Sequence, residues 1–278
     1  MLKKIFIFIL KIIIILIILI IIFFVSINIF TIPSNNRNWN NDQKVLPTTI
    51  VQENLVDIKN IRNFKYASTT SYTINYYDKQ YDLNKIKRVW YIVEPFSGIP
   101  GSAHTFLSFE FEGNVFVSVS VEIRKEKGES FHPIKGLLNQ YEIMYVWADE
   151  KDVIDLRINH RKDQVFLYPM KAGPEKTKEL FLSIIDRTNK IYTQPEFYNT
   201  LFNTCTTNIV DHVNLISPKT IPTIDTSILF PENSDFLAYD LGLIYTDLPQ
   251  DKIREKFNIN EKGEAYKGDE NFSVRIRE

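Results

Sequence analysis

The chain has 278 residues, and its 33 basic and 34 acidic side chains leave a formal net charge of −1. This near-neutral balance gives no field that would favour a nucleic-acid partner, whereas 44% hydrophobic and 13% aromatic residues suffice for one sizeable core. No HExxH, CxxC, GxSxG or P-loop pattern occurs, so metal, serine-hydrolase and nucleotide chemistry have no support, and we expect no metal and no other cofactor.

The first 30 residues predict a membrane anchor. Three lysines, at positions 3, 4 and 11, precede an almost unbroken apolar run that is long enough to cross a hydrocarbon core of about 30 Å. The following SINIFTIPS contains neither a small-residue cleavage site nor a lipobox cysteine, which favours an uncleaved signal anchor over a removed leader, with cleavage as the alternative. The lysines predict a single-pass protein of the inner (cytoplasmic) membrane whose C-terminal domain lies in the periplasm, the extracytoplasmic space.

Residues 31–48 are polar, rich in Asn and interrupted by Pro, which predicts a linker. Residues 49–278 show no repeat and no second linker, so we expect one extracytoplasmic domain. Its segments SAHTFLSFEF and NVFVSVSVEIR alternate strictly and predict a β-hairpin, and residues 174–192 and 205–215 predict helices. Several alternating segments with helices around them indicate an α+β fold with an antiparallel sheet and packed helices.

Cys205 is the only cysteine in the chain. A lone cysteine is most often a small buried hydrophobe, and this interpretation stays open. In an oxidising compartment, however, an unpaired thiol is also a candidate reactive group. Asn203 and Thr204 both suit an N-cap, which would place Cys205 in the first turn of a helix, where free N–H groups and the helix dipole stabilise a thiolate.

His104 is the best candidate among the four histidines for the base that an activated thiol requires. His212 follows Cys205 on the same predicted helix by about two turns, too far for a hydrogen bond within that helix. His132 and His160 lie in polar turns, where we expect solvation. His104 instead begins a strand, so its side chain is directed to one defined face of a sheet.

The turn between the two hairpin strands decides which residue faces His104. A three-residue turn at 112–114, with Gly113 in the left-handed conformation, places His104 opposite Glu122, whose carboxylate could fix the imidazole tautomer. A two-residue turn would place His104 opposite Ile123 and remove this partner. We therefore take Cys205, His104 and Glu122 as candidate nucleophile, base and orienting carboxylate.

Weaker candidates for substrate binding are Arg124, Arg157 and Arg161, whose guanidinium groups could meet a phosphate or carboxylate of a lipid headgroup. The alternative, which we favour, is ion pairing on a solvated face with Glu126, Asp155 and Asp163. Asn203 could donate to an oxyanion, although a capping role is the simpler interpretation.

The segments AHTFLSFEF, SVSVEIRKEKGE, YVWADEKDVIDLRINHR, QVFLYP and PEFYNTLFNTCTTNIVDHVN together resemble the extracytoplasmic domain family named after the lipoprotein N-acyltransferase Lnb, over about residues 50–250. Thr204 stands where the family pattern would have a second Asn. A strand histidine followed later by a cysteine at a helix start also resembles the permuted papain-like thiol enzymes, the NlpC-type peptidases and the lecithin-retinol acyltransferase group.

These resemblances imply Cys205 as the nucleophile, His104 as the general base and Glu122 as the third polar residue. They also imply a membrane-anchored cysteine acyltransferase that works through an acyl-thioester, with a membrane phospholipid and a lipoprotein or other cell-envelope substrate as partners. The alternatives are a Cys–His hydrolase acting on a peptidoglycan peptide or a lipid ester, and a non-catalytic envelope-binding module.

Overall fold

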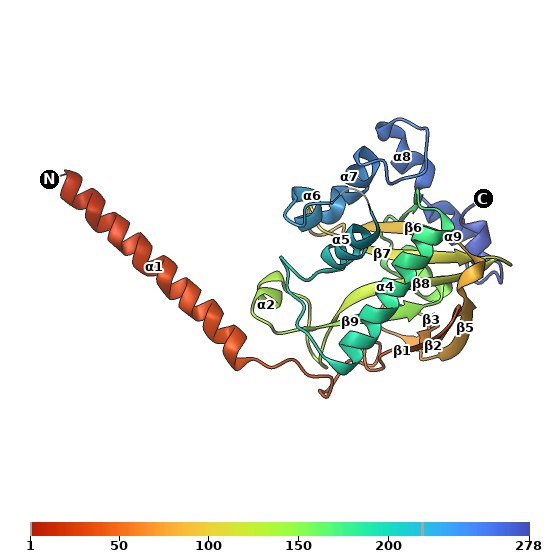
Figure 1. The fold of residues 1–278 in the computed structure, drawn as a ribbon, viewed down its shortest axis with the longest axis horizontal. Coiled ribbons are helices and arrows are strands. Elements are labelled where there is room, and N and C mark those ends of the chain that lie inside the picture. The colour runs from red at the N-terminus through yellow and green to blue at the C-terminus, as the bar shows by residue number, and fades with distance from the viewer. Residues whose placement is uncertain (1, 218–219) are drawn as a thin grey trace.

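A mixed eight-stranded sheet forms the centre of the domain (Figure 1). In the computed structural model, which describes residues 2–217 and 220–278, the strand order is β1-β2-β9-β8-β7-β6-β10, with β5 also paired to β2. The strands are β1 Thr48–Gln52, β2 Leu55–Arg62, β5 Tyr76–Asp82, β6 Ile86–Pro95, β7 Ala103–Phe111, β8 Val115–Arg124, β9 Glu142–Ala148 and β10 Phe166–Pro169. The short strands β3 Lys65–Tyr66 and β4 Tyr72–Thr73 form a separate ribbon.

The α+β prediction is confirmed, but the expectation of a purely antiparallel sheet is wrong. β2 and β9 pair in parallel at Arg62 and Ala148. These strands are far apart in the chain and are not joined by a hairpin, so no local turn fixes their relative direction.

The predicted β7–β8 hairpin has the expected register. The loop of residues 112–114 contains Gly113 and Asn114 with φ angles of 75° and 60°, the left-handed conformation that a short hairpin loop requires. Phe111 then opposes Val115, and further along the ladder Ser108 opposes Ser118 and Phe106 opposes Ser120. The three-residue turn is therefore confirmed.

Helices cover both faces of the sheet. α4 Pro174–Thr193 and α5 Cys205–Ile216 lie across one face, where Phe181 of α4 packs on Phe109 and Trp147 (Figure 1). α3 Glu150–Asp155, the π-helix η2 Leu156–Arg161 and α10 Phe272–Arg275 cover the other face, where Ile154 and Phe272 share a core with Phe106. Because both faces are covered, every residue of β7 is buried despite its alternating sequence.

The remaining helical segments are short. They are the 3₁₀ segment η1 Leu83–Lys85, α2 Pro133–Leu137, α6 Thr226–Leu229, the 3₁₀ segment η3 Pro231–Asn233, α7 Ser234–Asp240, α8 Gln250–Phe257 and α9 Asn260–Ala265.

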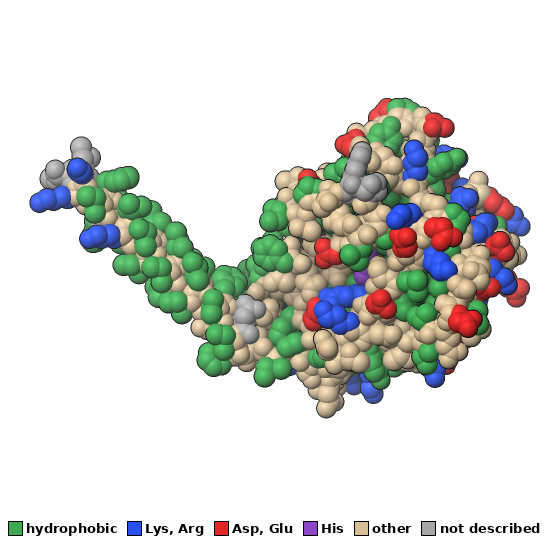
Figure 2. Space-filling view, in the orientation of Figure 1, with side chains coloured by type: hydrophobic (Ala, Val, Ile, Leu, Met, Phe, Trp, Pro, Cys, Tyr) green, Lys and Arg blue, Asp and Glu red, His purple; other side chains and the backbone are tan. Residues whose placement is uncertain are grey.

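The apolar helix α1 Leu2–Phe30 projects away from the domain (Figure 1). Its stretch Lys3–Ile27 is long and apolar enough to cross a membrane, and none of it is buried in the protein. Figure 2 shows hydrophobic side chains along the whole helix and lysines near its far end. Such a helix could be a membrane anchor or a signal sequence.

Much of the expected linker, residues 31–48, lies against the domain. Trp39 is 4% exposed and forms an isolated bridge with Glu126, and the side chain of Gln43 is buried. Arg124 stacks over the Trp39 ring and donates hydrogen bonds to the carbonyls of Gln43 and Lys44. The segment stays close to the sheet because it carries apolar side chains that can be buried there.

Candidate active site

Strands β7 and β8 diverge at the point where the candidate residues meet. The ladder between these strands ends at Phe106 and Ser120, whereas the β8–β9 ladder continues to Arg124. The first residues of β7, the last residues of β8 and the start of α5 surround a cavity of about 260 Å³. His104, Glu122 and Cys205 all line this cavity.

Cys205 is the first residue of α5, as the sequence predicts. Thr204 caps the helix in a reciprocal capping box with Thr207, so the chain enters the helix in a fixed direction. Thr105 follows His104, and Thr206 follows Cys205. Their hydroxyl groups are hydrogen-bonded at 3.0 Å, which links β7 to α5. The Cys205 side chain is 9% exposed and lies 3.7 Å from the Thr206 hydroxyl.

Asn203 does not take the cap position. Its amide donates to the carbonyl of Phe197 and its oxygen accepts from the amide of Asn208. These contacts hold the turn that precedes α5. Asn203 and Arg124 are both absent from the residues that line the cavity of Cys205.

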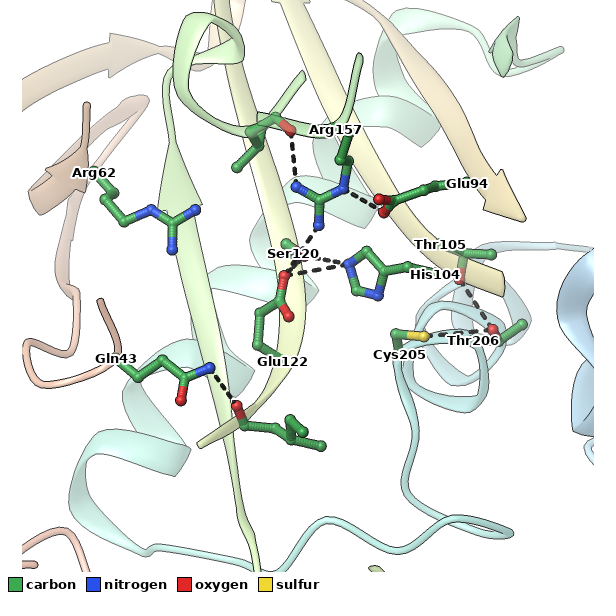
Figure 3. A network of polar contacts seen from close by, with 12 residues as sticks. Gln43, Arg62, Glu94, His104, Thr105, Ser120, Glu122, Arg157, Cys205 and Thr206 are labelled. Atoms are coloured by element: carbon green, nitrogen blue, oxygen red, sulfur yellow. Dashed lines mark hydrogen bonds and ion pairs between the residues drawn. The ribbon is translucent and has the colours of Figure 1, made fainter. Parts of the chain in front are cut away.

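His104 lies between the carboxylate and the thiol (Figure 3). Its Nε2 is 3.3 Å from Oε1 of Glu122 and 2.6 Å from Oγ of Ser120, and Ser120 in turn donates to Glu122 at 2.7 Å. Because Ser120 uses its proton toward Glu122, Nε2 carries the proton of the imidazole. Nδ1 is then the ring nitrogen left for the thiol of Cys205.

The charges of this group stabilise one another. Burial disfavours the imidazolium, but the Glu122 carboxylate and the Cys205 thiolate outweigh it and raise the pKa of His104 from 6.5 to about 10. Burial likewise opposes ionisation of the thiol. The charge and hydrogen bond of His104, helped by the Thr105 backbone N–H, nevertheless lower the pKa of Cys205 from 9.0 to about 7. The arrangement can therefore hold a thiolate beside an imidazolium near neutral pH.

Arg157 holds Glu122 from the other side (Figure 3). Its guanidinium is buried, donates to Glu94 at 2.5 Å and to Glu122 at 3.3 Å, and stacks over Phe106. Despite burial of the carboxylate, His104 first and then Arg157 keep the pKa of Glu122 well below its usual range. Arg157 thus lines the cavity as the partner of two carboxylates. The favoured prediction, an ion pair on a solvated face, is wrong for Arg157, because its guanidinium is buried with Glu94 and Glu122.

Two residues of the site were missed in the sequence. Ser120 lies two positions before Glu122 on the same strand. Because alternate residues of a strand share one face, the sequence could have predicted that Ser120 lies beside Glu122. Tyr198 lines the cavity, and burial followed by the charges of Cys205 and Glu122 raises its pKa, so its hydroxyl stays protonated. No local pattern in the sequence indicates that position.

The other histidines lie elsewhere. His132 caps α2 through its Nδ1, and His160 is paired with Asp155 at 3.3 Å rather than solvated, with its side chain 8% exposed. His212 contacts Tyr145 and Ser183 on the face of the sheet covered by α4. In residues 2–217 and 220–278, no group of three or more His, Cys, Asp or Glu side chains is arranged to hold a metal ion.

An α+β domain with a cysteine, a histidine and a carboxylate in one cavity defines a candidate thiol site. The chain belongs to the Lnb N-terminal periplasmic domain family, which matches residues 72–232, more than half of its length and all three of these residues. The domain is therefore a periplasmic one. No curated protein and no solved structure matches the chain.

Proposed function

We propose that this protein is a membrane-anchored periplasmic cysteine acyltransferase with the architecture of the permuted papain-like enzymes. The observation that supports the proposal best is the buried pair of Cys205 and His104, with the pKa of the thiol lowered to about 7 and the imidazole paired to Glu122 at 3.3 Å. A thiol that serves only for packing needs neither a charged imidazole nor a carboxylate behind it.

In the proposed reaction, the Cys205 thiolate attacks the carbonyl carbon of a lipid ester. The carbon–oxygen bond to the lipid alcohol breaks, and the imidazolium of His104 gives its Nδ1 proton to the leaving alkoxide. The acyl group is then held as a thioester. An amine attacks this thioester, and His104 takes the amine proton. The carbon–sulfur bond breaks, the amide product departs, and Cys205 is again a thiolate.

The other residues of the cavity have supporting roles in this proposal. Glu122 and Ser120 hold His104 with Nε2 protonated, so that Nδ1 is free for proton transfer. Tyr198 presents a protonated hydroxyl close to the thiol, where it could donate to the oxygen on which charge develops. Arg157 positions Glu122.

A second, apolar cavity favours a lipid ester over a peptide as the acyl donor. It has a volume of about 200 Å³ and lies along α5, lined by Thr206, Ile209, Val210 and Val213. Tyr91 also lines it, and burial first, then the charges of Asp235 and Cys205, raise the pKa of this tyrosine. The apolar space is thus close to the thiol, where an acyl chain would need to lie.

Mass spectrometry of the intact protein in phospholipid vesicles tests the proposal. We expect a mass increase of one acyl group on Cys205, lost in Cys205→Ala and retained in Asp211→Asn on the outer side of the same helix. Addition of a diacylated lipopeptide with a free amino terminus should consume the adduct and yield the N-acylated peptide.

Each other outcome contradicts part of the proposal. Loss of the adduct to water at the same rate with and without the lipopeptide would indicate a hydrolase. A protein that forms no adduct and whose cellular phenotype survives Cys205→Ala would be a binding module.

A further inference from the structure

Four large apolar side chains are exposed on two segments that adjoin the Cys205 cavity, one at residues 131–134 and one at residues 201–202. Phe131, which lines the cavity, is 40% exposed, and Ile134 in α2 is 58% exposed. Leu201 and Phe202, shortly before Cys205 in the chain, are 40% and 68% exposed. We call these four residues the apolar rim. Clustered exposed apolar side chains mark interaction sites more often than isolated ones do.

The two segments that carry the apolar rim form one surface. The hydroxyl of Thr200 donates to the carbonyl of Pro133 at 2.7 Å, which joins the turn before α5 to the start of α2. Gly136 packs so closely on Thr200 and Tyr198 that a side chain at this position would collide with them. The exposed residues therefore belong to one connected surface rather than to separate loops.

The turn at Leu201 and Phe202 has no need of apolar residues for its own structure. Asn199 and Asn203 pair across its base, and the side chain of Asn199 accepts from the N–H groups of both tip residues. Turn tips in water are usually Gly, Asn, Asp, Ser or Pro. Two large hydrophobic residues at such a tip indicate contact with something apolar.

The two segments that carry the apolar rim extend to the end of α1. Thr31, the residue after α1, accepts a hydrogen bond from the side chain of Asn139, two residues beyond the end of α2. Phe30, Asn139 and Phe197 line one shared hollow, so both rim-bearing segments reach the end of this helix. In Figure 1, α2 lies on the side of the domain beside α1, and Figure 2 shows hydrophobic side chains along that edge.

We propose that α1 spans the membrane and that the apolar rim rests in the interfacial region of the same bilayer, so that the Cys205 cavity opens onto lipid. The end of a membrane-spanning helix lies at the bilayer surface, and the segments that touch it must lie there too. Aromatic and aliphatic side chains are the groups that enter this region favourably. The inference is independent of any chemistry at Cys205.

The fold supplies a matched control at the opposite end of the domain. α4 has 20 residues, which corresponds to a length of about 30 Å. Near its C-terminal end, the carbonyl of Tyr192 accepts from Asn35, in the segment that follows α1. Near its N-terminal end, Lys178 donates to Asn54, in the β1–β2 turn. Leu55, 37% exposed and next to Asn54 in the chain, is therefore an apolar surface residue away from the end of α4 that contacts Asn35.

Fluorescence quenching in phospholipid nanodiscs tests the proposal on the full chain. In a Cys205→Ser background, single cysteines are introduced by Ile134→Cys, Phe202→Cys or Leu55→Cys and are labelled with an environment-sensitive fluorophore. Spin-labelled phospholipid should quench the labels at positions 134 and 202 several-fold more strongly than the label at position 55. Aqueous iodide should give the reverse order.

Thermal unfolding of each labelled protein, compared with the unlabelled Cys205→Ser parent, verifies that the fold is intact, and two rim positions guard against the failure of one. Equally weak lipid quenching at all three positions would overturn the proposal. Shielding of positions 134 and 202 from both quenchers would also overturn it, because the rim would then be covered by protein.

Discussion

His104 and His212 are both buried and both contact hydroxyl groups, yet the protein holds them in opposite charge states. His104 has the Glu122 carboxylate at 3.3 Å, and its pKa is raised to about 10. His212 has the hydroxyls of Tyr145 and Ser183 at 2.9 Å on its two ring nitrogens. Burial, and to a lesser extent the charge of Arg187, lower the pKa of His212 to about 4.

The difference shows what separates a candidate base from a structural histidine in this fold. Burial alone favours the neutral imidazole, and a neighbouring negative charge, at His104 first the Glu122 carboxylate and then the Cys205 thiolate, reverses that effect. The contact between Ser183 and His212 has the atoms of a nucleophile–base pair, but Ser183 also donates to the Leu180 carbonyl, and the imidazole is a weak base. In the Cys205 and His104 pair, the imidazole has a carboxylate as its charge partner. The Ser183 and His212 pair has none.

The largest expected effect separates the two nucleophile candidates. Cys205→Ala should abolish the acyl adduct in phospholipid vesicles, because no other thiol exists in the chain. Ser183→Ala, which removes the hydroxyl beside His212, should leave the adduct unchanged. Intact-mass spectrometry measures both. Persistence of the adduct in Cys205→Ala would place the chemistry elsewhere.

The next largest effect is a difference between variants of His104 and His212 in the rate of adduct formation. His104→Ala should slow adduct formation by about 10²- to 10⁴-fold, the usual contribution of a positioned general acid–base group. His212→Gln should change the rate little, provided that circular dichroism shows a folded protein. Similar losses in two folded variants would remove the distinction between the two sites.

A smaller effect is expected from Glu122. Glu122→Gln keeps the size of the side chain but removes the charge that raises the pKa of His104, so less thiolate should form on Cys205. We expect alkylation of the thiol at pH 7 to slow by about tenfold. Glu126→Gln, a carboxylate outside the cavity, is the control. Equal alkylation rates in both variants would show that Glu122 does not support the imidazolium.

The pH dependence of stability should distinguish the histidines as well. The folded-state pKa of His212 lies below its usual value of 6.5, so its contribution is complete above pH 6.5 and is lost as the pH falls toward 4. The loss corresponds to about 3 kcal/mol. The pKa of His104 is raised, so its contribution is complete below pH 6.5 and is lost as the pH rises through 10.

Urea unfolding across this pH range measures both effects in a Cys205→Ala background, in which no thiol titrates. His104 then keeps only the part of its raised pKa that Glu122 supplies, so its alkaline loss should begin at a lower pH than in the wild type. His212→Gln should flatten only the acid side of the stability curve, and His104→Gln only the alkaline side. Flattening of the same side by both variants would contradict the assignment of opposite charge states.

The sequence predicted the elements whose geometry is set locally. Adjacent Gly113 and Asn114 can both take the left-handed conformation, which fixed the β7–β8 register, and with it the approach of His104 to Glu122. Helices α4 and α5 begin at Pro174 and Cys205, as predicted.

Partners set by tertiary contacts were not accessible from spacing. Asn203 and Thr204 are equally good caps in sequence. In the fold, the side-chain oxygen of Asn203 accepts from the Asn208 amide and its own amide donates to the carbonyl of Phe197, which leaves the cap to Thr204. The parallel pairing of β2 with β9 and the packing of Trp39 on the domain depend on the assembled fold in the same way. The approach of Cys205 to His104 was implied by a family resemblance and not by spacing.

The pH dependence of the alkylation rate of Cys205 by iodoacetamide tests the central claim most directly, because it reports the thiolate fraction itself. For the wild-type protein we predict an inflection near pH 7, and for His104→Ala an inflection displaced toward the ordinary thiol value of 9.0. An inflection at the same pH in both proteins would contradict the claim that His104 holds Cys205 as a thiolate.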